Sequence, residues 1–194
     1  MNGDEFRKLV LCNLVNDALL DEVMRLDLPD AWIVSGCLTQ TIWNIRTRRA
    51  IDYGINDYDV FYFDPDLSWE AEDRAIGRLR ETSTRLGVRI EVRNQARVHL
   101  WYQQKHGTFY PPLRNSAEGI DRFLTRCTQV GLQRGGTGDH VYAPSGFDEL
   151  ESMTVRPNFT PSFSAAAYRK KTARWLSLWP ELTVVSPVEI EATK

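Results

Sequence analysis

The chain has 194 residues, of which 42% are apolar and 26% charged, and its formal net charge is −2. This length can bury one sizeable core, and the charge balance argues against a protein that coats nucleic acid through bulk positive charge. No stretch approaches the ~20 apolar residues of a membrane span, and the N-terminus lacks the features of a signal peptide. Three scattered cysteines fit neither a disulfide framework nor a zinc site. We expect a cytoplasmic protein with no membrane partner and no extended nucleic-acid binding.

The first 107 residues alternate predicted helices and strands. Apolar residues at three-and-four spacing predict helices, and short apolar or alternating runs predict strands. Ser68 and Asn94 are typical N-caps, and Gly87 is a typical helix end. The predicted elements are a helix over 4–24, a strand over 31–35, a helix over 38–44, a strand over 57–63, a helix over 69–86, a strand over 88–93 and a helix over 94–107.

The pattern is weaker after Pro111 and Pro112. It predicts a short helix over 116–124, a strand over 127–132 and a last amphipathic helix over 164–179, which Pro180 ends. The alternation of strands with helices predicts an α/β or α+β sheet protein.

The clearest chemical signal is a pair of aspartates in the predicted strand 57–63. Asp is uncommon in strands, yet Asp57 and Asp59 stand in an otherwise aromatic and β-branched run. Because side chains alternate along a strand, both face the same side, roughly 7 Å apart. Two such carboxylates repel each other unless a cation bridges them, and their oxygens suit Mg²⁺ or Mn²⁺. The pair predicts a metal site; the alternative is that Asp57 ends a loop and Asp59 is a solvated strand residue.

Two further features accompany this pair. Glu91, in the predicted strand 88–93, could add a third carboxylate for two-metal phosphoryl chemistry, or could be a surface residue between two arginines. Gly36, between a predicted strand and a predicted helix, would leave free backbone N–H groups that can bind phosphate. The alternative for Gly36 is an ordinary turn.

Together these pieces resemble the nucleotidyltransferase superfamily. Its signature is a Gly-Ser-type turn after a strand, then Asp-x-Asp or Asp-x-Glu on the next strand, then a later acidic strand residue. Here the matching residues are Gly36-Cys37, Asp57 and Asp59, and Glu91, with Cys37 in the place of the usual Ser. More specifically, the chain looks like the stand-alone bacterial nucleotidyltransferase-like family. The stretches that carry this resemblance are 36–44, 56–64, 94–102, 143–150, 155–158, 174–175 and 179–182.

The resemblance implies a nucleotidyltransferase fold: a mixed twisted sheet flanked by helices, with a core over 1–107 and a C-terminal elaboration over 108–194, or one continuous domain. It also implies that Asp57 and Asp59 hold the ion that carries a nucleoside triphosphate such as ATP. With Glu91 they would hold a second ion that activates an acceptor hydroxyl for attack on the α-phosphate. The nucleotide and the acceptor stay open.

A second hypothesis is a non-catalytic nucleotide-binding or partner-binding protein that keeps this fold. It is motivated by Cys37 and by the lack of a recognisable acceptor-binding domain.

Other polar residues are candidates for the substrate cleft. On the predicted helix after Asn94, helical spacing places Gln95, His99, Tyr102 and His106 on one face. We expect nucleotide contacts from Gly36, Cys37, Asn94, Arg97 and His99, the alternative for the helix being an ordinary solvated face. Lys170, Lys171 and Arg174, on the last predicted helix, are more typical of a solvated face than of a phosphate site. The tryptophans Trp43, Trp101, Trp175 and Trp179 are predicted to pack in the core and at interfaces.

Overall fold

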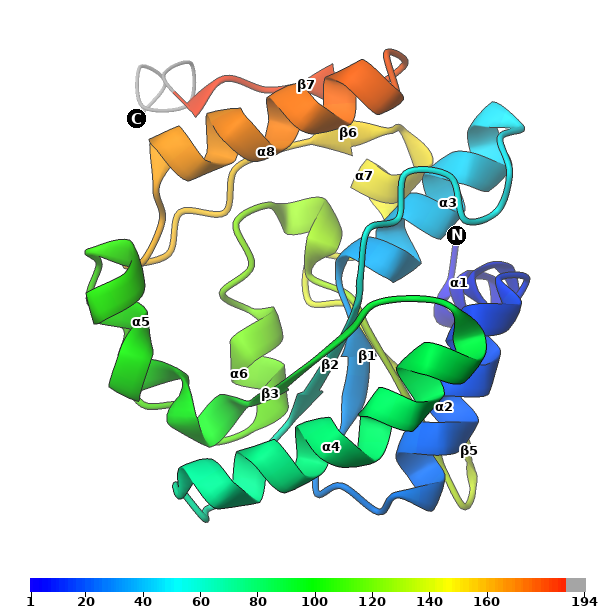
Figure 1. The fold of residues 1–194 in the computed structure, drawn as a ribbon. Helices are drawn as coiled ribbons and strands as arrows, with labels where there is room; N and C mark the ends of the chain where they lie inside the picture. Colours follow the sequence, from blue (N-terminus) through cyan, green and yellow to red (C-terminus); the bar gives the residue numbers. More distant parts are fainter. Residues whose placement is uncertain (188–194) are drawn as a thin grey trace.

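The computed structural model describes residues 1–187, in which a five-stranded mixed sheet is flanked by helices (Figure 1). The strand order is β3-β2-β1-β4-β5, with β2 and β3 parallel and the other neighbours antiparallel. The strands of this sheet are β1 (Trp32–Val34), β2 (Tyr58–Tyr62), β3 (Ile90–Asn94), β4 (Gly131–Gly135) and β5 (Gly138–Tyr142). The expected fold class, a mixed sheet with helices around it, is confirmed.

The helices lie between and after these strands. They are α1 (Gly3–Val10), α2 (Leu14–Arg25), α3 (Gly36–Thr47), α4 (Trp69–Leu86), α5 (Val98–His106), α6 (Ser116–Ile120), α7 (Asp148–Glu151) and α8 (Ala165–Leu178). Two 3₁₀ turns, η1 (Gln95–Arg97) and η2 (Arg126–Thr128), and a small parallel pair, β6 (Thr154–Val155) with β7 (Thr183–Val184), complete the described elements. None of these helices is long and apolar enough to cross a membrane.

The first predicted helix is two helices in the structure. The chain leaves α1 at Leu11, and Asn13 then caps α2 by accepting a hydrogen bond from the Val15 N–H at 3.1 Å. The Asn13 amide also donates to the buried hydroxyls of Thr41 and Tyr58, each at 3.2 Å. A side chain with these partners fixes the break, which apolar spacing alone did not reveal.

The strand predicted over 127–132 begins later than expected. Residues 126–128 form η2, because the Thr128 hydroxyl donates to the Thr125 carbonyl at 2.9 Å and closes a tight turn. The strand β4 follows at Gly131 and forms a hairpin with β5. The main sheet therefore contains strands from both sides of residue 108.

The two faces of β2 differ in character. Tyr58, Val60 and Tyr62 are buried in the main core, which the helices α2 and α4 help to cover, whereas Asp59 and Phe61 are only partly buried and point to the opposite face. Alternation along the strand thus places the acidic residue on the face away from the core.

Three tryptophans join the last helix to the helix that follows β1. The ring of Trp43, on α3, meets the rings of Trp175 and Trp179 edge-on, with centroids 5.1 Å and 5.4 Å away. All three side chains are buried, as predicted. This packing fixes α8 beside α3.

Candidate functional site

The two aspartates lie where β1 ends and β2 begins. Asp57 directly precedes β2, and Asp59 is in register with Val34 of β1 and with Glu91 of β3. Within residues 1–187, neither aspartate carboxylate has a hydrogen-bond or ion-pair partner. Burial raises the pKa of Asp59 to about 7; the charge of Asp57 and, less strongly, that of Glu91 add to this shift, whereas Lys171 opposes it. The pair is a repulsive, partly desolvated cluster of oxygen donors.

Glu91 is near this pair, but arginines hold its carboxylate. It forms ion pairs with Arg89 and, at 3.7 Å, with Arg93. In the described part of the chain, no group of three His, Cys, Asp or Glu side chains is close enough to hold a metal ion. The structure thus places Glu91 beside Asp59 in register without assembling a ring of three metal ligands.

The turn into α3 offers backbone donors next to the acidic pair. Ser35 precedes the helix with φ of 63° and ψ of −121°, an unusual conformation for a residue with a side chain. The N–H groups of Gly36 and Cys37 belong to the first turn of α3 and have no partner inside the helix. Gly36 is partly exposed and Cys37 is fully buried, so the N–H of Gly36 is the one that an anion could reach.

The Cys37 side chain faces the interior. It is fully buried, and its thiol donates to the Val34 carbonyl at 3.6 Å. Burial and the nearby charge of Asp59 raise the thiol pKa far above its usual range. The thiol is therefore not suited to attack a substrate, because a buried neutral thiol is a poor nucleophile. The residue as a whole has no exposed area, which differs from the predicted nucleotide contact.

Asn94 is fully buried, and both polar groups of its side chain are hydrogen-bonded within the protein. Its carbonyl oxygen accepts from the Asp64 and Ala96 N–H groups, both at 3.1 Å. Its amide donates to the carbonyls of Asp64 and Asp66, at 2.9 Å and 3.3 Å. These four bonds satisfy the side chain, so its role here is to tie β3 to the loop after β2, which differs from the predicted nucleotide contact.

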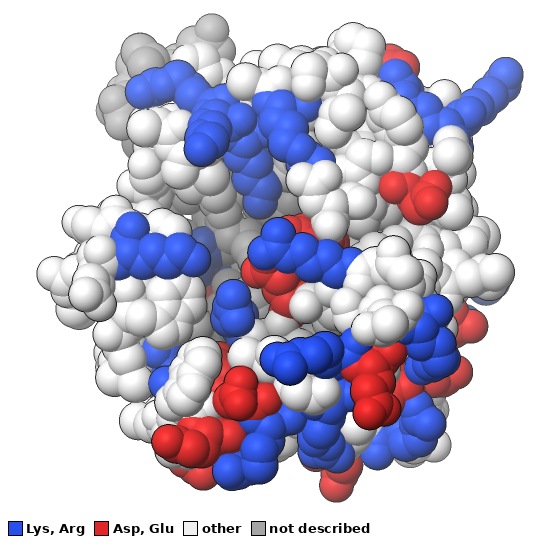
Figure 2. All heavy atoms as spheres, in the orientation of Figure 1, with Lys and Arg blue, Asp and Glu red and all other residues white. Residues whose placement is uncertain are grey.

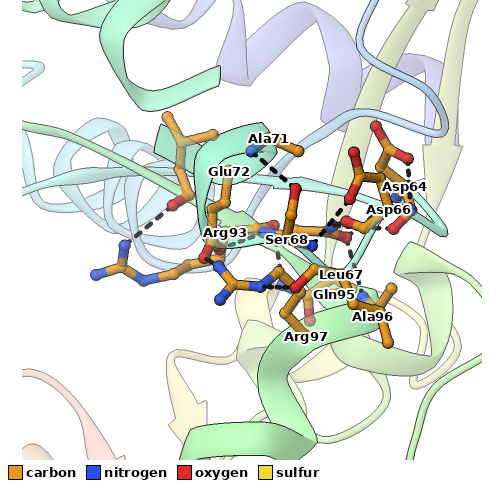
Figure 3. A network of polar contacts seen from close by, with 12 residues as sticks. Asp64, Asp66, Leu67, Ser68, Ala71, Glu72, Arg93, Gln95, Ala96 and Arg97 are labelled. Carbon is orange, nitrogen blue, oxygen red and sulfur yellow. Dashed lines mark hydrogen bonds and ion pairs between the residues drawn. The ribbon is translucent and has the colours of Figure 1, made fainter. Parts of the chain in front are cut away.

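Arg97 also differs from its predicted role (Figure 3). It pairs with Glu72 of α4, whose carboxylate also accepts the Asn94 N–H at 2.9 Å. Its Nε donates to the Leu67 carbonyl at 3.0 Å, and the guanidinium lies 5.4 Å from the ring centroid of Trp69. This arginine braces the junction of β3 and α5 against α4, where a phosphate ligand was expected.

A cleft of about 520 Å³ begins two residues further along β2 and β3 than Asp59 and Glu91, at Phe61 and Arg93. Figure 2 shows a hollow near the middle of this face, bordered by Lys and Arg, with acidic side chains at one side. The lining residues are Phe61, Arg93, Gln95, Val98, Trp101, Tyr102, Lys105, His106, Thr108, Tyr110, Gly119, Arg122, Phe123, Leu124, Thr160, Ser162, Phe163, Ser164, Ala167 and Lys171.

The polar face predicted for the helix after Asn94 lies partly at this cleft. Gln95, Tyr102 and His106 line the cleft, as expected. His99 is not among the lining residues, and its Nδ1 is buried without a partner in the described chain. Trp101, predicted to be a packing residue, lines the cleft. The prediction for His99 gains no support from this geometry.

Lys171 is the residue that the sequence interpretation undervalued. On α8, Lys170 is exposed, whereas Lys171 turns inward and lines the cleft. Burial lowers its pKa, and the charges of Asp59 and Asp57 oppose this shift. Arg174, one turn later, donates to the Gly54 carbonyl at 2.7 Å and holds the loop before Asp57. A run of two lysines in the sequence gave no sign of which one points inward.

Comparisons with known proteins agree with this geometry. The mixed sheet with its flanking helices is a nucleotidyltransferase fold. The family profile described as nucleotidyltransferase matches residues 21–184. The chain belongs to this nucleotidyltransferase family. No curated protein matches the chain at a significant level.

Two solved structures are similar to the chain. One is a protein whose NMR structure reveals a CCA-adding enzyme head domain; it is 25% identical, with a TM-score of 0.76, and the match covers 95% of this chain and 96% of that one. The other is a CCA-adding enzyme in complex with CTP, 13% identical with a TM-score of 0.54, where the match covers 94% of this chain and 44% of that one. The second likeness shows the fold alone, and the chain spans less than half of that enzyme.

Proposed function

We propose that this protein transfers a nucleoside monophosphate from a Mg²⁺-bound nucleoside triphosphate to an acceptor hydroxyl. The observation that carries the proposal is the unpaired, mutually repelling carboxylate pair, Asp57 and Asp59, beside the free N–H groups of the α3 turn. Family membership supports the class of reaction. The proposed metal dependence and the proposed substrates rest on the site alone.

The donor set of the site fits a magnesium ion. Asp57 and Asp59 offer oxygen ligands that no described side chain occupies, and burial, together with the charge of Asp57, raises the pKa of Asp59, so that a bound cation would stabilise its ionised form. When bound there, Mg²⁺ would neutralise phosphate charge and make the α-phosphorus easier to attack. Glu91 would join these ligands after its arginine partners release it.

The protein's own groups would position the nucleotide. The N–H of Gly36, which is partly exposed at the start of α3, would donate to a phosphate oxygen, as helix N-termini do. Lys171, which lies in the field of both aspartates, would bring a positive charge to the phosphates. Because a CCA-adding enzyme of similar fold was solved with CTP, CTP is the first triphosphate to test, with ATP as a second.

Nucleotide binding provides the first test. Titration calorimetry with Mg²⁺ and either CTP or ATP would compare wild type with Asp57→Ala and Asp59→Ala. We expect each variant to lose about tenfold or more in affinity, which corresponds to ~1.4 kcal/mol. Asp73→Ala, at an exposed position of α4, is the matched control and should bind as wild type. Unchanged affinity in both site variants would reject the metal site.

Pyrophosphate release provides the second test. Sustained release with a pool of hydroxyl acceptors, abolished in Asp59→Ala, is the expected result.

A non-catalytic nucleotide-binding protein is the second candidate. It is favoured by one observation: Glu91 is held by Arg89 and Arg93, so the described residues contain no preassembled set of three metal ligands. Binding of Mg²⁺ and nucleotide without any pyrophosphate release, in wild type and in Arg89→Ala alike, would favour this candidate over transfer.

A further inference from the structure

We propose that the cleft beside the acidic pair binds the acceptor, and that this acceptor is an anionic small molecule with a flat ring. This inference rests on the proposed transfer reaction and names the substrate class that the reaction would use.

The charge of the cleft is of one sign. Arg93, Lys105, Arg122 and Lys171 line it, and no Asp or Glu is among its lining residues. Within residues 1–187, Lys105, Arg122 and Lys171 have no ion pair with a carboxylate; Arg93 is shared with Glu91 at 3.7 Å. In a chain with a net charge of −2, such a concentration of unpaired cations selects for an anion.

One of these cations lacks hydrogen-bond partners. The guanidinium of Arg122 lies 5.0 Å from the ring centroid of Tyr110, and its Nη1 is buried without a partner among the described residues. A buried donor without an acceptor is costly, and such groups are rare in folded proteins. An anionic ligand in the cleft would offer this guanidinium the acceptor that the protein does not supply.

Aromatic side chains also line the cleft. The Phe61 and Phe123 rings stack with centroids 5.3 Å apart, and the Tyr102 and Tyr110 rings lie 4.4 Å apart. Trp101 carries Lys105 over its ring at 5.3 Å. Flat apolar faces next to cations suit a ligand that combines a ring with negative charge. The volume of about 520 Å³ is that of a small-molecule pocket.

The position of the cleft assigns it to the acceptor. The α3 turn lies on the β1 side of Asp59, at the beginning of β2. The cleft lies on the other side, toward the ends of β2 and β3 and along α5. In phosphoryl transfer the attacking and leaving oxygens are roughly in line. With pyrophosphate at the α3 turn, the acceptor therefore approaches from the cleft.

In the proposed transfer, one bond to phosphorus forms as another breaks. The acceptor hydroxyl oxygen forms a bond to the α-phosphorus, the bond from that phosphorus to the pyrophosphate oxygen breaks, and the hydroxyl proton is released to water. The products are the nucleotidylated acceptor and pyrophosphate.

A pair of fluorescent probes tests the chemistry of the cleft. 8-Anilinonaphthalene-1-sulfonate combines a flat naphthalene ring system with one negative charge, and N-phenyl-1-naphthylamine is its neutral analogue. We expect Arg122→Gln and Lys105→Gln each to weaken the anionic probe about five- to tenfold, ~1 kcal/mol or more, and the neutral probe less than twofold. Lys105 is exposed, so its replacement does not threaten folding. Arg114→Gln, at a side chain that is 87% exposed and does not line the cleft, is the matched control. Equal effects on both probes, or none, would overturn the proposal.

A second measurement separates the acceptor from the nucleotide. Saturating Mg²⁺ with CTP or ATP should leave the anionic probe bound, with its affinity lowered by no more than about threefold, because Lys171 is the one cleft cation that we also assign to the nucleotide. Competitive displacement of the probe would show that the cleft belongs to the nucleotide; it would overturn the acceptor assignment and leave the proposed function standing. If neither triphosphate binds wild type without the probe, the proposed function fails and the acceptor role fails with it.

Discussion

Replacing Arg97 with Met tests whether this residue braces the fold or binds the nucleotide. Arg97 is 11% exposed and Glu72, its partner, is 3% exposed. Removing the guanidinium would leave a buried carboxylate that keeps only the Asn94 N–H, at 2.9 Å. Breaking a buried pair in this way costs ~3–5 kcal/mol. For a chain of this size the melting temperature should fall by about 2–4 °C for each kcal/mol.

Two assays on the same variants separate the roles. Urea unfolding followed by tryptophan fluorescence gives the free energy of unfolding, and calorimetry under folding conditions gives the affinity for Mg²⁺ and nucleotide. We expect Arg97→Met to lose stability and to keep nucleotide affinity within about threefold, a difference below ~1 kcal/mol. Glu72→Gln, which still accepts the Asn94 N–H, should lose less stability, ~1–3 kcal/mol. A tenfold loss of affinity in Arg97→Met with unchanged stability would refute the reasoning and restore the nucleotide role.

Lys171→Met should weaken the binding of Mg²⁺ and nucleotide about tenfold, ~1.4 kcal/mol, in the same calorimetric assay, whereas Lys170→Met should not change it; equal behaviour of the two would contradict the inward role of Lys171. The folded pKa of Asp59, about 7, lies above its ordinary value of 3.8, so the metal-free protein should lose stability as pH rises through this window. Asp59→Asn, in EDTA, should become progressively more stable than wild type as pH rises over the same window, by at most ~4 kcal/mol. Urea unfolding at several pH values checks this, and a difference that stays flat or changes in the opposite direction would contradict it. Gly54→Ala should cost at least ~1–3 kcal/mol, because φ is +69° and a Cβ would come within 2.7 Å of the Trp179 ring. Gly77→Ala, in the exposed middle of α4 with nothing within 4 Å, should instead stabilise by ~0.5–1 kcal/mol, and opposite signs in unfolding experiments are the check.

The acidic pair could be predicted from sequence because its signal is local. Alternation along one strand fixes which side chains share a face, and the structure places Asp59 opposite to the buried Tyr58 and Val60. The role of Asn94 as a cap was also local, and it was confirmed: its side chain accepts from the Ala96 N–H at 3.1 Å. The carboxylate that fixes Arg97 lies 25 residues earlier, on another element, so no local pattern could place it.

The inward orientation of Lys171 could not be predicted from a local sequence pattern either. Its direction follows from α8 lying against α3, which the edge-on contacts of Trp175 and Trp179 with Trp43 determine. Those residues were predicted to pack, but helical spacing does not say against which partner. A sequence reading could have found the lysine only by knowing the tertiary neighbour of the last helix.

The arrangement of charge along β2 and β3 fits the proposal that one face binds two anionic substrates. Along β2, the side chain on this face changes from the acidic Asp59 to the aromatic Phe61. Along β3, it changes from the acidic Glu91 to the basic Arg93. Asp59 is in register with Glu91, and Phe61 with Arg93. The acidic end would repel any phosphate that arrives without a cation, whereas the cationic, aromatic end would attract an anion that arrives without one. Lys171, which belongs to the cleft and lies in the field of both aspartates, stands at the boundary. Under the proposed function, selection by charge would send a metal-bound triphosphate to one end and a free anionic acceptor to the other, and it would bring the two reacting groups together near Lys171.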